Sequence, residues 1–440
     1  MVSFDSPSIW TDPAYRPSAA LAEDLDTEVV IIGAGYTGLA AAVALRARGV
    51  RVVAIDAAAV GAGASGRNAG HLTPTIGKDL PTLSRLYGAE RTRALVTLAE
   101  RAVAHVEDAI AIHDIDCDYR PVGNVLAGLH RGQQPKLSVA VEAARQAGAA
   151  VQMLSDSDIR ERGLPGYVRC GYLATAGGIL DPGKYLHGLR RAALEAGALL
   201  YENTPALRIE ECATGVVVET PHARIRASRA VLATNAYSPG LGFLRRRITP
   251  LSVTLFATDP LTAAQREAVG WPGSEGIQTA HSALESYRLT TDGRVVGGAR
   301  YVGYRYGSRI RSGVDHAVAG RLTALFRTRH PELAAVEIDR VWSGPIAMTL
   351  DFLPSIGYTS SSQRIVYSIG CTGHGIAMSS YLGTHTAAML CEGSDAPSAL
   401  TDPRRLPVPP EPLRWLGVHT ITASLEIADR ITDRRARRPV

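Results

Sequence analysis

The chain has 440 residues, of which 46% are hydrophobic and 20% are charged, and its formal net charge is +5. This composition excludes the disordered and fibrous classes and is typical of a globular enzyme long enough for two domains. No apolar run approaches the roughly 20 residues that span a bilayer, and no basic and then apolar leader opens the chain. We therefore expect a cytoplasmic protein without a membrane span.

Cysteines and basic residues narrow the classes of partner. The five cysteines are scattered and contain no CxxC pair, which predicts neither a disulfide framework nor a metal site. Only three of the 47 basic residues are lysine, and the arginines are spread along the chain apart from a basic tail at 434–438. Nucleic-acid surfaces more often cluster both basic types with exposed aromatic residues. We therefore expect no nucleic-acid partner.

The stretch from Thr27 to Asp56 predicts a strand, a glycine turn, a helix and a second strand. Apolar residues 29–32 lead into the turn, whose sequence is Gly33-Ala34-Gly35-Tyr36-Thr37-Gly38. In such a turn the first glycine permits the bend, the second lets a pyrophosphate approach the backbone, and the third lets the helix pack on the strand. Asp56 follows the third glycine by 18 residues, where a carboxylate accepts hydrogen bonds from a ribose. The pattern predicts a dinucleotide-binding α/β domain with the phosphates at the helix N-terminus.

A second glycine-rich segment lies between this unit and the next predicted helix. Its sequence is Gly61-Ala62-Gly63-Ala64-Ser65-Gly66-Arg67-Asn68-Ala69-Gly70-His71. Small residues let the chain pass close to an extended cofactor, while Ser65 and Asn68 can bond a ribityl or phosphate group and Arg67 can neutralise charge. A nicotinamide dinucleotide needs no such segment, and a flexible linker would not place arginine and asparagine at its centre. The segment therefore favours a flavin dinucleotide.

The rest of the chain predicts elements that alternate between two domains. Asp292-Gly293, between the apolar runs 286–290 and 294–298, predicts a hairpin. Helices are expected over 80–113, 185–196 and 376–390, and strands over 119–129, 216–218, 229–234 and 364–369.

These elements predict a discontinuous cofactor domain of the α/β class. This Rossmann-like, FAD-binding domain would comprise residues 1–79, 178–240 and 335–402. An α+β substrate domain would comprise 80–177 and 241–334, with a mainly antiparallel sheet that covers the cofactor.

Both ends of the chain carry additional segments. The N-terminal arm over 8–26 is expected to lie over the cofactor domain, and residues 403–440 predict a helix with a basic tail. One face of this helix collects Trp415, Val418, Ile421, Leu425, Ala428 and Ile431. Such a face favours packing on the chain itself or on a partner subunit, with a membrane surface as the alternative.

Six segments carry a likeness to a known family. They are EVVIIGAGYTGLAAA at 28–42, GAGASGRNAG at 61–70, GGILDPGKYLHGLRRAALEAGALLYENT at 177–204, VLATNAY at 231–237, WSGPIAMTLDFLPSIG at 342–357 and SIGCTGHGIAMSSYLGTHTAAML at 368–390. In this order they resemble the FAD-dependent amine and amino-acid oxidases of the D-amino-acid oxidase, glycine oxidase and sarcosine oxidase group, with the γ-glutamylputrescine oxidase branch nearest. The resemblance implies FAD bound without a covalent tether, because Gly344 stands where some relatives carry the linking cysteine.

The resemblance also implies the residues that hold FAD. The helix over 376–390 would point its N-terminus at the flavin, where free N–H groups stabilise the negative charge of the reduced ring. His374 would add a hydrogen bond or, alternatively, only cap this helix. The implied FAD-binding residues are Gly33, Gly35, Tyr36, Thr37, Gly38, Asp56, Ser65, Gly66, Arg67, Asn68, Gly70, His71, Ala206, Thr234, Gly344, Asp351, Gly373, His374, Gly375 and Ile376.

Candidate substrate contacts are less specific. Arg288 or Arg300 would clamp a substrate carboxylate through two parallel hydrogen bonds, unless they are ordinary outward residues of a strand. His71 would approach the flavin, with a core histidine bonded to the backbone as the alternative. The candidate catalytic residues are His71, Tyr287, Arg288, Arg300 and His374, and His281 and Trp342 are further candidates for the pocket.

The resemblance implies oxidation of a C–N bond in a primary or secondary amine or an amino acid. A hydride would pass to FAD, and O2 would reoxidise the flavin to give H2O2 and an imine or aldehyde. Sarcosine-oxidising relatives place a lysine over the flavin to assist oxygen, whereas no lysine follows Lys184 here. The alternatives are an amine dehydrogenase that uses a quinone or carrier, an FAD-dependent tRNA-modifying enzyme and a non-catalytic nucleotide-binding protein.

Overall fold

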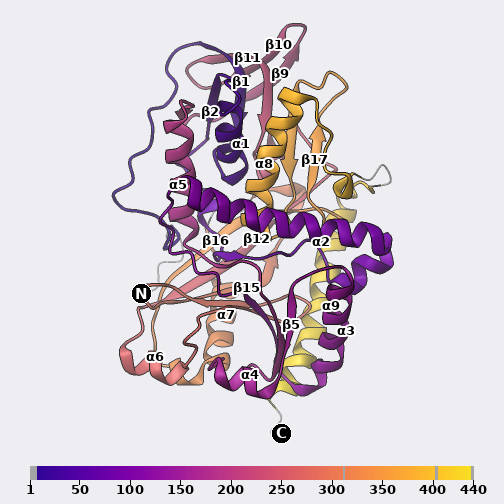
Figure 1. The fold of residues 1–440 in the computed structure, drawn as a ribbon. Coiled ribbons are helices and arrows are strands. Elements are labelled where there is room, and N and C mark those ends of the chain that lie inside the picture. The colour runs from indigo at the N-terminus through magenta and orange to yellow at the C-terminus, as the bar shows by residue number, and fades with distance from the viewer. Residues whose placement is uncertain (1–6, 311–312, 402–404, 438–440) are drawn as a thin grey trace.

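The structure of the protein is a computed structural model that describes residues 7–310, 313–401 and 405–437. One large sheet lies in the upper half of Figure 1 and another in the lower half, and the long helix α2 (Leu80–Ile112) crosses the molecule where the two halves meet. The first sheet is mainly parallel and the second mainly antiparallel. This arrangement confirms the predicted α/β fold class.

The first sheet is built around β1 (Leu25–Ile32), whose last residues are buried on both faces as a parallel strand requires. Its order is β17-β18-β11-β1-β2-β8, and all neighbours on this path are parallel except β17 and β18. An antiparallel pair, β9 and β10, extends from β11. The other strands are β2 (Val52–Ile55), β8 (Leu199–Tyr201), β9 (Arg208–Cys212), β10 (Gly215–Glu219), β11 (Arg224–Leu232), β17 (Ser355–Tyr358) and β18 (Ile365–Ile369).

Three helices pack beside this sheet. α1 (Tyr36–Arg46) lies against both α5 (Pro182–Glu195) and α8 (Gly375–Glu392). Its alanines allow this close approach, and Gly383 of α8 lies directly against Ala40. The apolar residues of these helices and of one face of the sheet form a single buried core.

The second sheet has the order β16-β12-β15-β14-β13-β4-β6-β5, and only its β13–β4 pair is parallel. The predicted hairpin at Asp292-Gly293 is confirmed as the connection between β14 and β15. Helix α7 (His316–Arg329) packs on β12 and β15. The strands are β4 (Asn124–Gly128), β5 (Val151–Leu154), β6 (Cys170–Ala174), β12 (Thr249–Thr258), β13 (Gly276–Thr279), β14 (Ser286–Leu289), β15 (Val295–Gly303) and β16 (Ile338–Met348).

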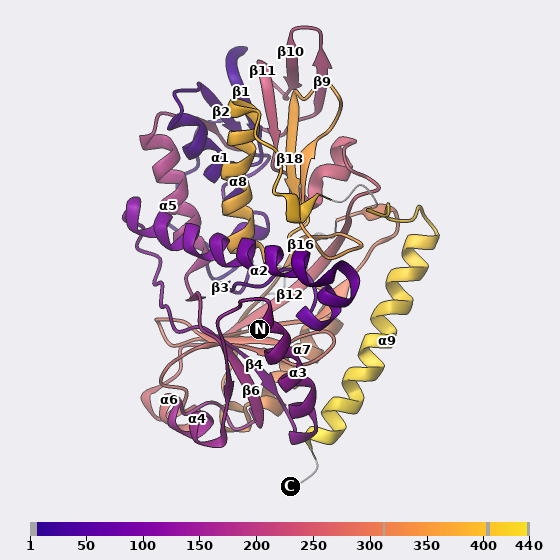
Figure 2. The same cartoon turned by 45° about the vertical axis from the view of Figure 1, so that its right-hand side comes forward.

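Shorter elements join the two sheets. β3 (His71–Leu72) pairs with β7 (Gly178–Ile179), which ties the end of the second glycine-rich segment to the strand before α5. α3 (Gln134–Gln146), α4 (Asp156–Glu161) and α6 (Ala263–Val269) lie around the second sheet (Figure 2). None of the described helices combines the length and the hydrophobicity needed to span a bilayer.

The predicted division of the chain needs one change in detail. Residues 335–402 were expected in the cofactor domain, but β16 pairs along its length with β12 of the second sheet. Of that range, β17, β18 and α8 belong with the first sheet, and Leu353, Ala399 and Leu400 pack in the core beside it. The cause is hydrogen bonding at the sheet edge, because β12 offers β16 a long antiparallel partner.

The N-terminal arm lies along the first half of the molecule, as expected. Tyr15 Oη donates to Glu202 at 2.5 Å, and the Leu21 amide donates to Thr204 Oγ1 at 3.0 Å. Further along the arm towards the N-terminus, Trp10 Nε1 donates to the carbonyl of Asn68 at 2.8 Å. The arm therefore reaches the second glycine-rich segment.

The C-terminal helix α9 (Leu413–Ala436) packs differently from the prediction. Trp415, Ile421 and Ile431 of the expected apolar face are exposed, whereas Asp429 is buried. The inward face instead follows residues 414, 418, 422, 425, 429 and 432. Acidic side chains turn towards the body because buried arginines lie there, so polar pairing and not apolar burial sets the orientation of this helix.

Candidate active site

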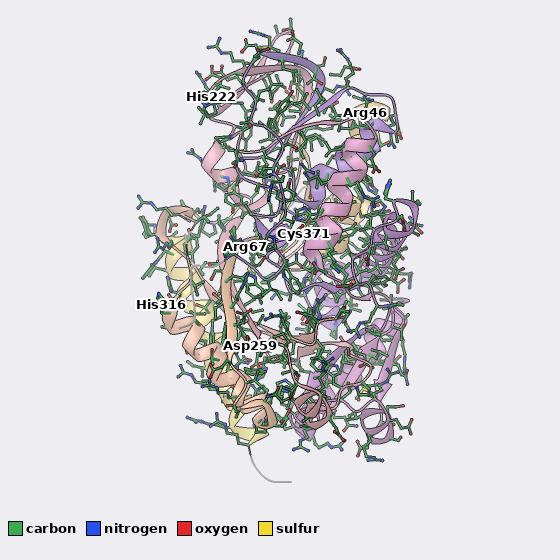
Figure 3. The ribbon with its side chains drawn as sticks, turned by 90° about the vertical axis from the view of Figure 1, so that its left-hand side faces the viewer. Arg46, Arg67, His222, Asp259, His316 and Cys371 are labelled. Atoms are coloured by element: carbon green, nitrogen blue, oxygen red, sulfur yellow. The ribbon has the colours of Figure 1, made fainter. Side chains whose placement is uncertain are left out.

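A cavity of about 780 Å³ lies between the two sheets. The glycine turn after β1, the second glycine-rich segment, the middle of β12, the end of β16 and the start of α8 all contribute to its wall. Arg67 and Cys371, which both line it, lie near the middle of the molecule in Figure 3. The cavity is therefore formed by segments that are distant in the sequence.

The glycine turn is shaped for a closely bound group. Gly33 has a φ of +103°, and a Cβ added there would lie 2.7 Å from the carbonyl oxygen of Ala233. A Cβ on Gly35 would lie 2.8 Å from Ser65 Oγ. The first turn of α1 contains no acidic residue and Gly35 gives it no side-chain cap, so its N–H groups suit a pyrophosphate. Gly38 lies behind the cavity wall, where it packs against the Gly33 carbonyl.

Asp56 stands at the end of β2 on the cavity wall. Its two oxygens accept from the amides of Ala34, at 2.8 Å, and Ala58, at 3.1 Å. Burial raises the pKa of Asp56, while these backbone hydrogen bonds lower it. The carboxylate keeps lone pairs for a ribose, and Ala206 and Thr234 line the cavity nearby.

Side chains of the N-terminal arm and of β16 donate to backbone carbonyls of the second glycine-rich segment. Ser8 Oγ donates to the carbonyl of Gly66 at 2.6 Å, and Trp10 Nε1 donates to that of Asn68. Trp342 Nε1, from β16, donates to the carbonyl of Arg67 at 2.9 Å. Trp342, expected on the pocket, thus lies behind it and supports the segment. Gly66 also lies behind the wall, packed against Gly61.

Side chains of the segment itself divide between support and lining. Asn68 Nδ2 donates to the Ser65 carbonyl at 2.9 Å and its Oδ1 accepts from the Gly70 amide at 2.9 Å, so its amide folds the loop. Arg67 donates from Nε to Ala62 at 2.7 Å and from Nη1 to Ser343 at 3.0 Å. Burial lowers the pKa of Arg67. Arg67 is the one arginine or lysine among the described residues that line the cavity.

His71 lines the cavity with a defined tautomer. Asn124 Nδ2 donates to the carbonyls of Leu72 and Gly178, which leaves its Oδ1 as the acceptor 2.9 Å from His71 Nδ1. The proton of the neutral ring is therefore on Nδ1. Burial lowers the pKa of His71 to about 4, so the ring is uncharged at neutral pH.

The turn before α8 supplies the opposite wall. Gly373, Gly375 and Ile376 line the cavity, and α8 has no acidic residue in its first turn. His374 is the N-cap residue of α8 but makes no side-chain cap bond, and it also lines the cavity. Burial lowers the pKa of His374 and raises that of Cys371 to about 11, so both side chains are neutral at pH 7.

Arg288 and Tyr287, two of the expected substrate contacts, lie away from the cavity. Arg288 Nη1 donates to the carbonyls of Gly70, at 3.1 Å, and Leu180, and its guanidinium lies over Trp10. Burial lowers the pKa of Arg288 to about 10. Tyr287 packs in the core of the second sheet and donates to Glu285 at 3.1 Å. These positions correct the expectation that Arg288 clamps a substrate and that Tyr287 contacts it.

Arg300 and His281 belong to a buried charge cluster under α9, which corrects their expected place on the pocket. Arg300 Nη1 donates to Glu285 Oε1 at 2.8 Å, and its Nη2 donates to Asp433 Oδ2 at 3.1 Å. His281 Nδ1 lies 2.8 Å from Thr279 Oγ1 and its Nε2 lies 3.2 Å from Asp433 Oδ1. Strand alternation turns Arg300 of β15 away from the cavity that its neighbour Ala299 lines, whereas His281 lies in the loop after β13.

Asp351 also lies outside the cavity wall, because its carboxylate pairs with Arg405 at 2.7 Å. The sequence analysis missed most of the wall facing the cofactor segments. Most of these residues are small or apolar and lie outside the six motifs, Tyr237 and Phe352 excepted, so the fold is needed to reveal them. They include Tyr237, Val253, Leu255, Gln278, Ser282, Ala283, Leu284, Ala299, Val302, Phe352 and Leu425.

Known proteins share both the sequence pattern and the fold. The family model described as FAD dependent oxidoreductase, named DAO, matches residues 28–389. The gamma-glutamylputrescine oxidoreductase of Escherichia coli is 29% identical over 382 residues, which cover 86% of each protein. The structures of L-proline dehydrogenase from P. horikoshii and glycine oxidase from Geobacillus kaustophilus superpose with TM-scores of 0.72 and 0.71 at 20% and 21% identity. They cover 86% of this chain and 96% and 99% of theirs.

The cavity, its glycine turn and Asp56 fit the cofactor that this family uses. Cβ atoms would obstruct the turn, and the first turn of α1 carries no acidic residue. Asp56 stands on the cavity wall at the end of β2, where the glycine pattern predicts a ribose-binding carboxylate. The chain therefore belongs to the DAO family of FAD-dependent oxidoreductases.

Proposed function

We propose that the protein oxidises the C–N bond of a small primary or secondary amine or amino acid. Bound FAD supplies a two-electron acceptor for the hydride that leaves the carbon next to nitrogen. The amine proton passes to solvent, and water then converts the imine to a carbonyl compound and free ammonia or amine. O2 takes up the two electrons and two protons to form H2O2.

The composition of the cavity wall carries this proposal. Among the described lining residues Asp56 is the one carboxylate, and it stands at the ribose end. The wall near the second sheet is built from residues such as Val253, Leu255, Ala299 and Val302. Such a wall suits a reaction in which the protein binds, orients and excludes water while the cofactor carries the chemistry.

The uncharged side chain of His71 on the cavity wall also supports an amine as the substrate. His71 is uncharged with its proton on Nδ1, so it does not repel a cationic substrate as it enters. Two relatives named for an activity on small amines or amino acids match over 86% and 82% of the chain. Two relatives named for tRNA biosynthesis match over only 26% and 21% of it, which argues against the tRNA-modifying alternative. The amine itself must lose its charge before the hydride leaves, and an apolar cavity favours that neutral form.

Anaerobic bleaching of the bound flavin tests the proposal. The purified holoenzyme is mixed with polyamines, γ-glutamyl amines, N-methyl amino acids and D- and L-amino acids, and air is then admitted. Bleaching by one class, followed by fast recovery with one H2O2 for each substrate, is the expected result. Slow recovery without peroxide would instead favour the dehydrogenase, and no bleaching by any class would overturn the proposal. We also expect acid precipitation to release the FAD, since the attachment is proposed to be non-covalent.

A further inference from the structure

Helix α9 reaches the cavity although it lies beyond the family match, which ends at residue 389. In Figure 2 it runs beside the second sheet as a separate yellow helix. Leu425, in its middle, lines the cavity together with Ser282, Ala283 and Leu284 from the loop between β13 and β14. One wall of the cavity therefore combines a family element with a helix outside the match.

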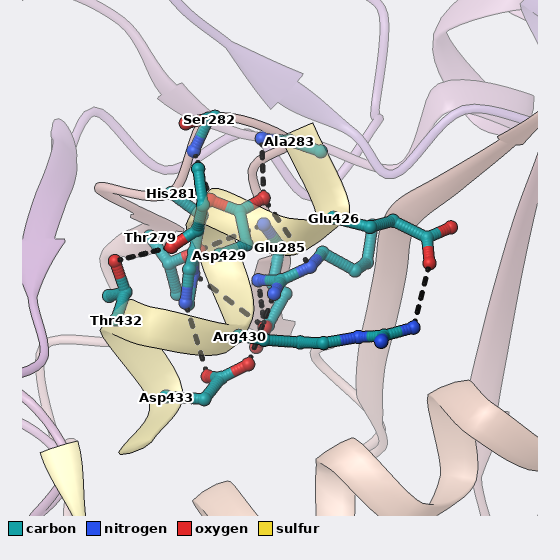
Figure 4. Close-up of polar contacts among 12 residues, drawn as sticks. Thr279, His281, Ser282, Ala283, Glu285, Glu426, Asp429, Arg430, Thr432 and Asp433 are labelled. Atoms are coloured by element: carbon teal, nitrogen blue, oxygen red, sulfur yellow. Dashed lines mark hydrogen bonds and ion pairs between the residues drawn. The ribbon is translucent and has the colours of Figure 1, made fainter. Parts of the chain in front are cut away.

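Asp429 joins this helix to that loop. Its Oδ1 accepts from the Ser282 amide at 2.7 Å and its Oδ2 accepts from the Ala283 amide at 2.9 Å (Figure 4). Asp429 is only 1% exposed. Both carboxylate oxygens are thus used to fix the backbone of two consecutive residues that line the cavity.

The next turn of α9 anchors the helix itself. Asp433 accepts from Arg329 Nη2 at 2.5 Å and from Arg300 Nη2 at 3.1 Å. His281, Glu285 and Asp433 bring ligand atoms within 4.8 Å of one another, a spacing that also suits a cation. Arg300 and Arg329 already bind the carboxylates of this group, so it serves as an attachment of the helix.

We propose that α9 is a wall of the substrate pocket and sets which substrates fit, a proposal that rests on the proposed function. Leu425 is its specificity-determining contact. Asp429 is a positioning residue, which acts by holding the 282–284 loop. The apolar Leu425 and the apolar residues of β12 and β15 select the part of the substrate that extends away from its nitrogen.

Changing the volume at Leu425 tests the proposal on turnover. Leu425→Ala and Leu425→Phe are compared over a series of straight-chain primary amines and their γ-glutamyl derivatives. Leu425→Phe should lower kcat/KM for the longest substrates by about tenfold or more, and Leu425→Ala should shift the preference towards longer ones, because one methylene is worth roughly 10- to 200-fold in an apolar pocket. Ile421→Ala, on the exposed side of the same helix, is the matched control and should leave the series unchanged. Equal profiles for all four proteins would overturn the proposal.

The positioning role of Asp429 is tested by comparing KM with the limiting rate of flavin reduction. Asp429→Ala removes both acceptors, whereas Asp429→Asn keeps one oxygen. We expect KM to rise in both, more in the alanine variant, with the limiting rate of anaerobic flavin reduction unchanged. A fall in that limiting rate with an unchanged KM would contradict a positioning role.

A labelling experiment separates failure of this proposal from failure of the proposed function. The thiols introduced by Leu425→Cys and Ile421→Cys are treated in the holoenzyme with iodoacetamide and with fluorescein maleimide, and the labelled peptides are identified by mass spectrometry. The thiol at position 425 should react with the small iodoacetamide but not with the bulky fluorescein maleimide. The thiol at position 421 should react with both reagents. Equal reaction of the thiol at position 425 with both reagents would refute the proposal that α9 is a wall of the pocket, whether or not any amine reduces the flavin.

Discussion

Replacing Glu285 by glutamine perturbs the charge cluster that holds α9. Glu285 is 1% exposed and accepts four hydrogen bonds. Arg329 donates twice, from Nε and Nη2 at 2.9 Å each, Arg300 donates at 2.8 Å and Tyr287 at 3.1 Å. The amide of Glu285→Gln removes one negative charge and turns one acceptor into a donor.

The loss in stability follows from this geometry. Two of the four bonds end on each carboxylate oxygen, so the amide nitrogen of Glu285→Gln loses two of them and faces donors. Arg300 and Arg329 have side chains only 3% and 4% exposed, so water does not replace the missing partner. Removing one partner of a buried pair costs about 3–5 kcal/mol. That is a large part of the roughly 5–15 kcal/mol that stabilises a typical domain.

Urea unfolding of the holoenzyme measures this loss. Tryptophan fluorescence reports on the second sheet, because Trp271 is fully buried in its core. The control is Asp156→Asn, which breaks an ion pair with Arg131 whose two side chains are about half exposed. Exposed pairs contribute little, so this variant should unfold close to the unmodified protein. If Glu285→Gln unfolds at the same urea concentration as the control, the argument from burial is wrong.

Three further predictions concern pH, tautomer and cofactor retention. Burial raises the pKa of Asp433. The hydrogen bond from His281 and the charge of Arg329 lower it by more, so the pKa lies well below its ordinary value of 3.8. The ionised Asp433 carboxylate therefore stabilises the folded protein fully above about pH 4, and this contribution is lost as the pH falls below that value. The difference in unfolding free energy between Asp433→Asn and the unmodified protein should be constant near neutrality and shrink in acid. Nitrogen NMR of the histidine rings should show His71 neutral with its proton on Nδ1 above about pH 5, and a titration near its ordinary pKa would contradict the Asn124 contact. Trp10→Phe removes the hydrogen bond to the carbonyl of Asn68, and one such bond contributes about 0.5–1.5 kcal/mol. The Kd of FAD in a fluorescence titration should therefore rise about two- to tenfold, whereas Trp415→Phe should leave it unchanged.

The sequence predicts the cofactor side of the molecule well because its signals are local. The spacing of Gly33, Gly35 and Gly38 and the distance to Asp56 are set within one strand, helix and strand unit. The hairpin at Asp292-Gly293 is equally local. Short-range steric and hydrogen-bonding rules decide such features, so no knowledge of distant partners is needed.

The second half of the pocket depends on distant pairs and was predicted poorly. Arg300 lies in the second sheet and His281 in the loop after β13, and both were expected on the pocket. Their carboxylate partner Asp433 lies more than 130 positions further along the chain. The apolar spacing of α9 likewise selected Ile421 and Ile431, while Asp429 is the residue that is buried. Apolar periodicity fails where buried arginines draw acidic side chains inward.

The strand order of the first sheet decides when the site can be complete during protein synthesis. β1 pairs with β11, and β11 pairs with β18. The part of the sheet that begins with β1 at residue 25 is therefore complete only after β18, which ends at residue 369, has been synthesised. Helix α9 emerges from the ribosome after the strands of both sheets, and Asp429 and Asp433 emerge with it. Until then Arg300 and Arg329 have only Glu285 among the carboxylates of their cluster. The pocket wall and the neutralisation of these arginines can therefore be completed only after both sheets have been synthesised.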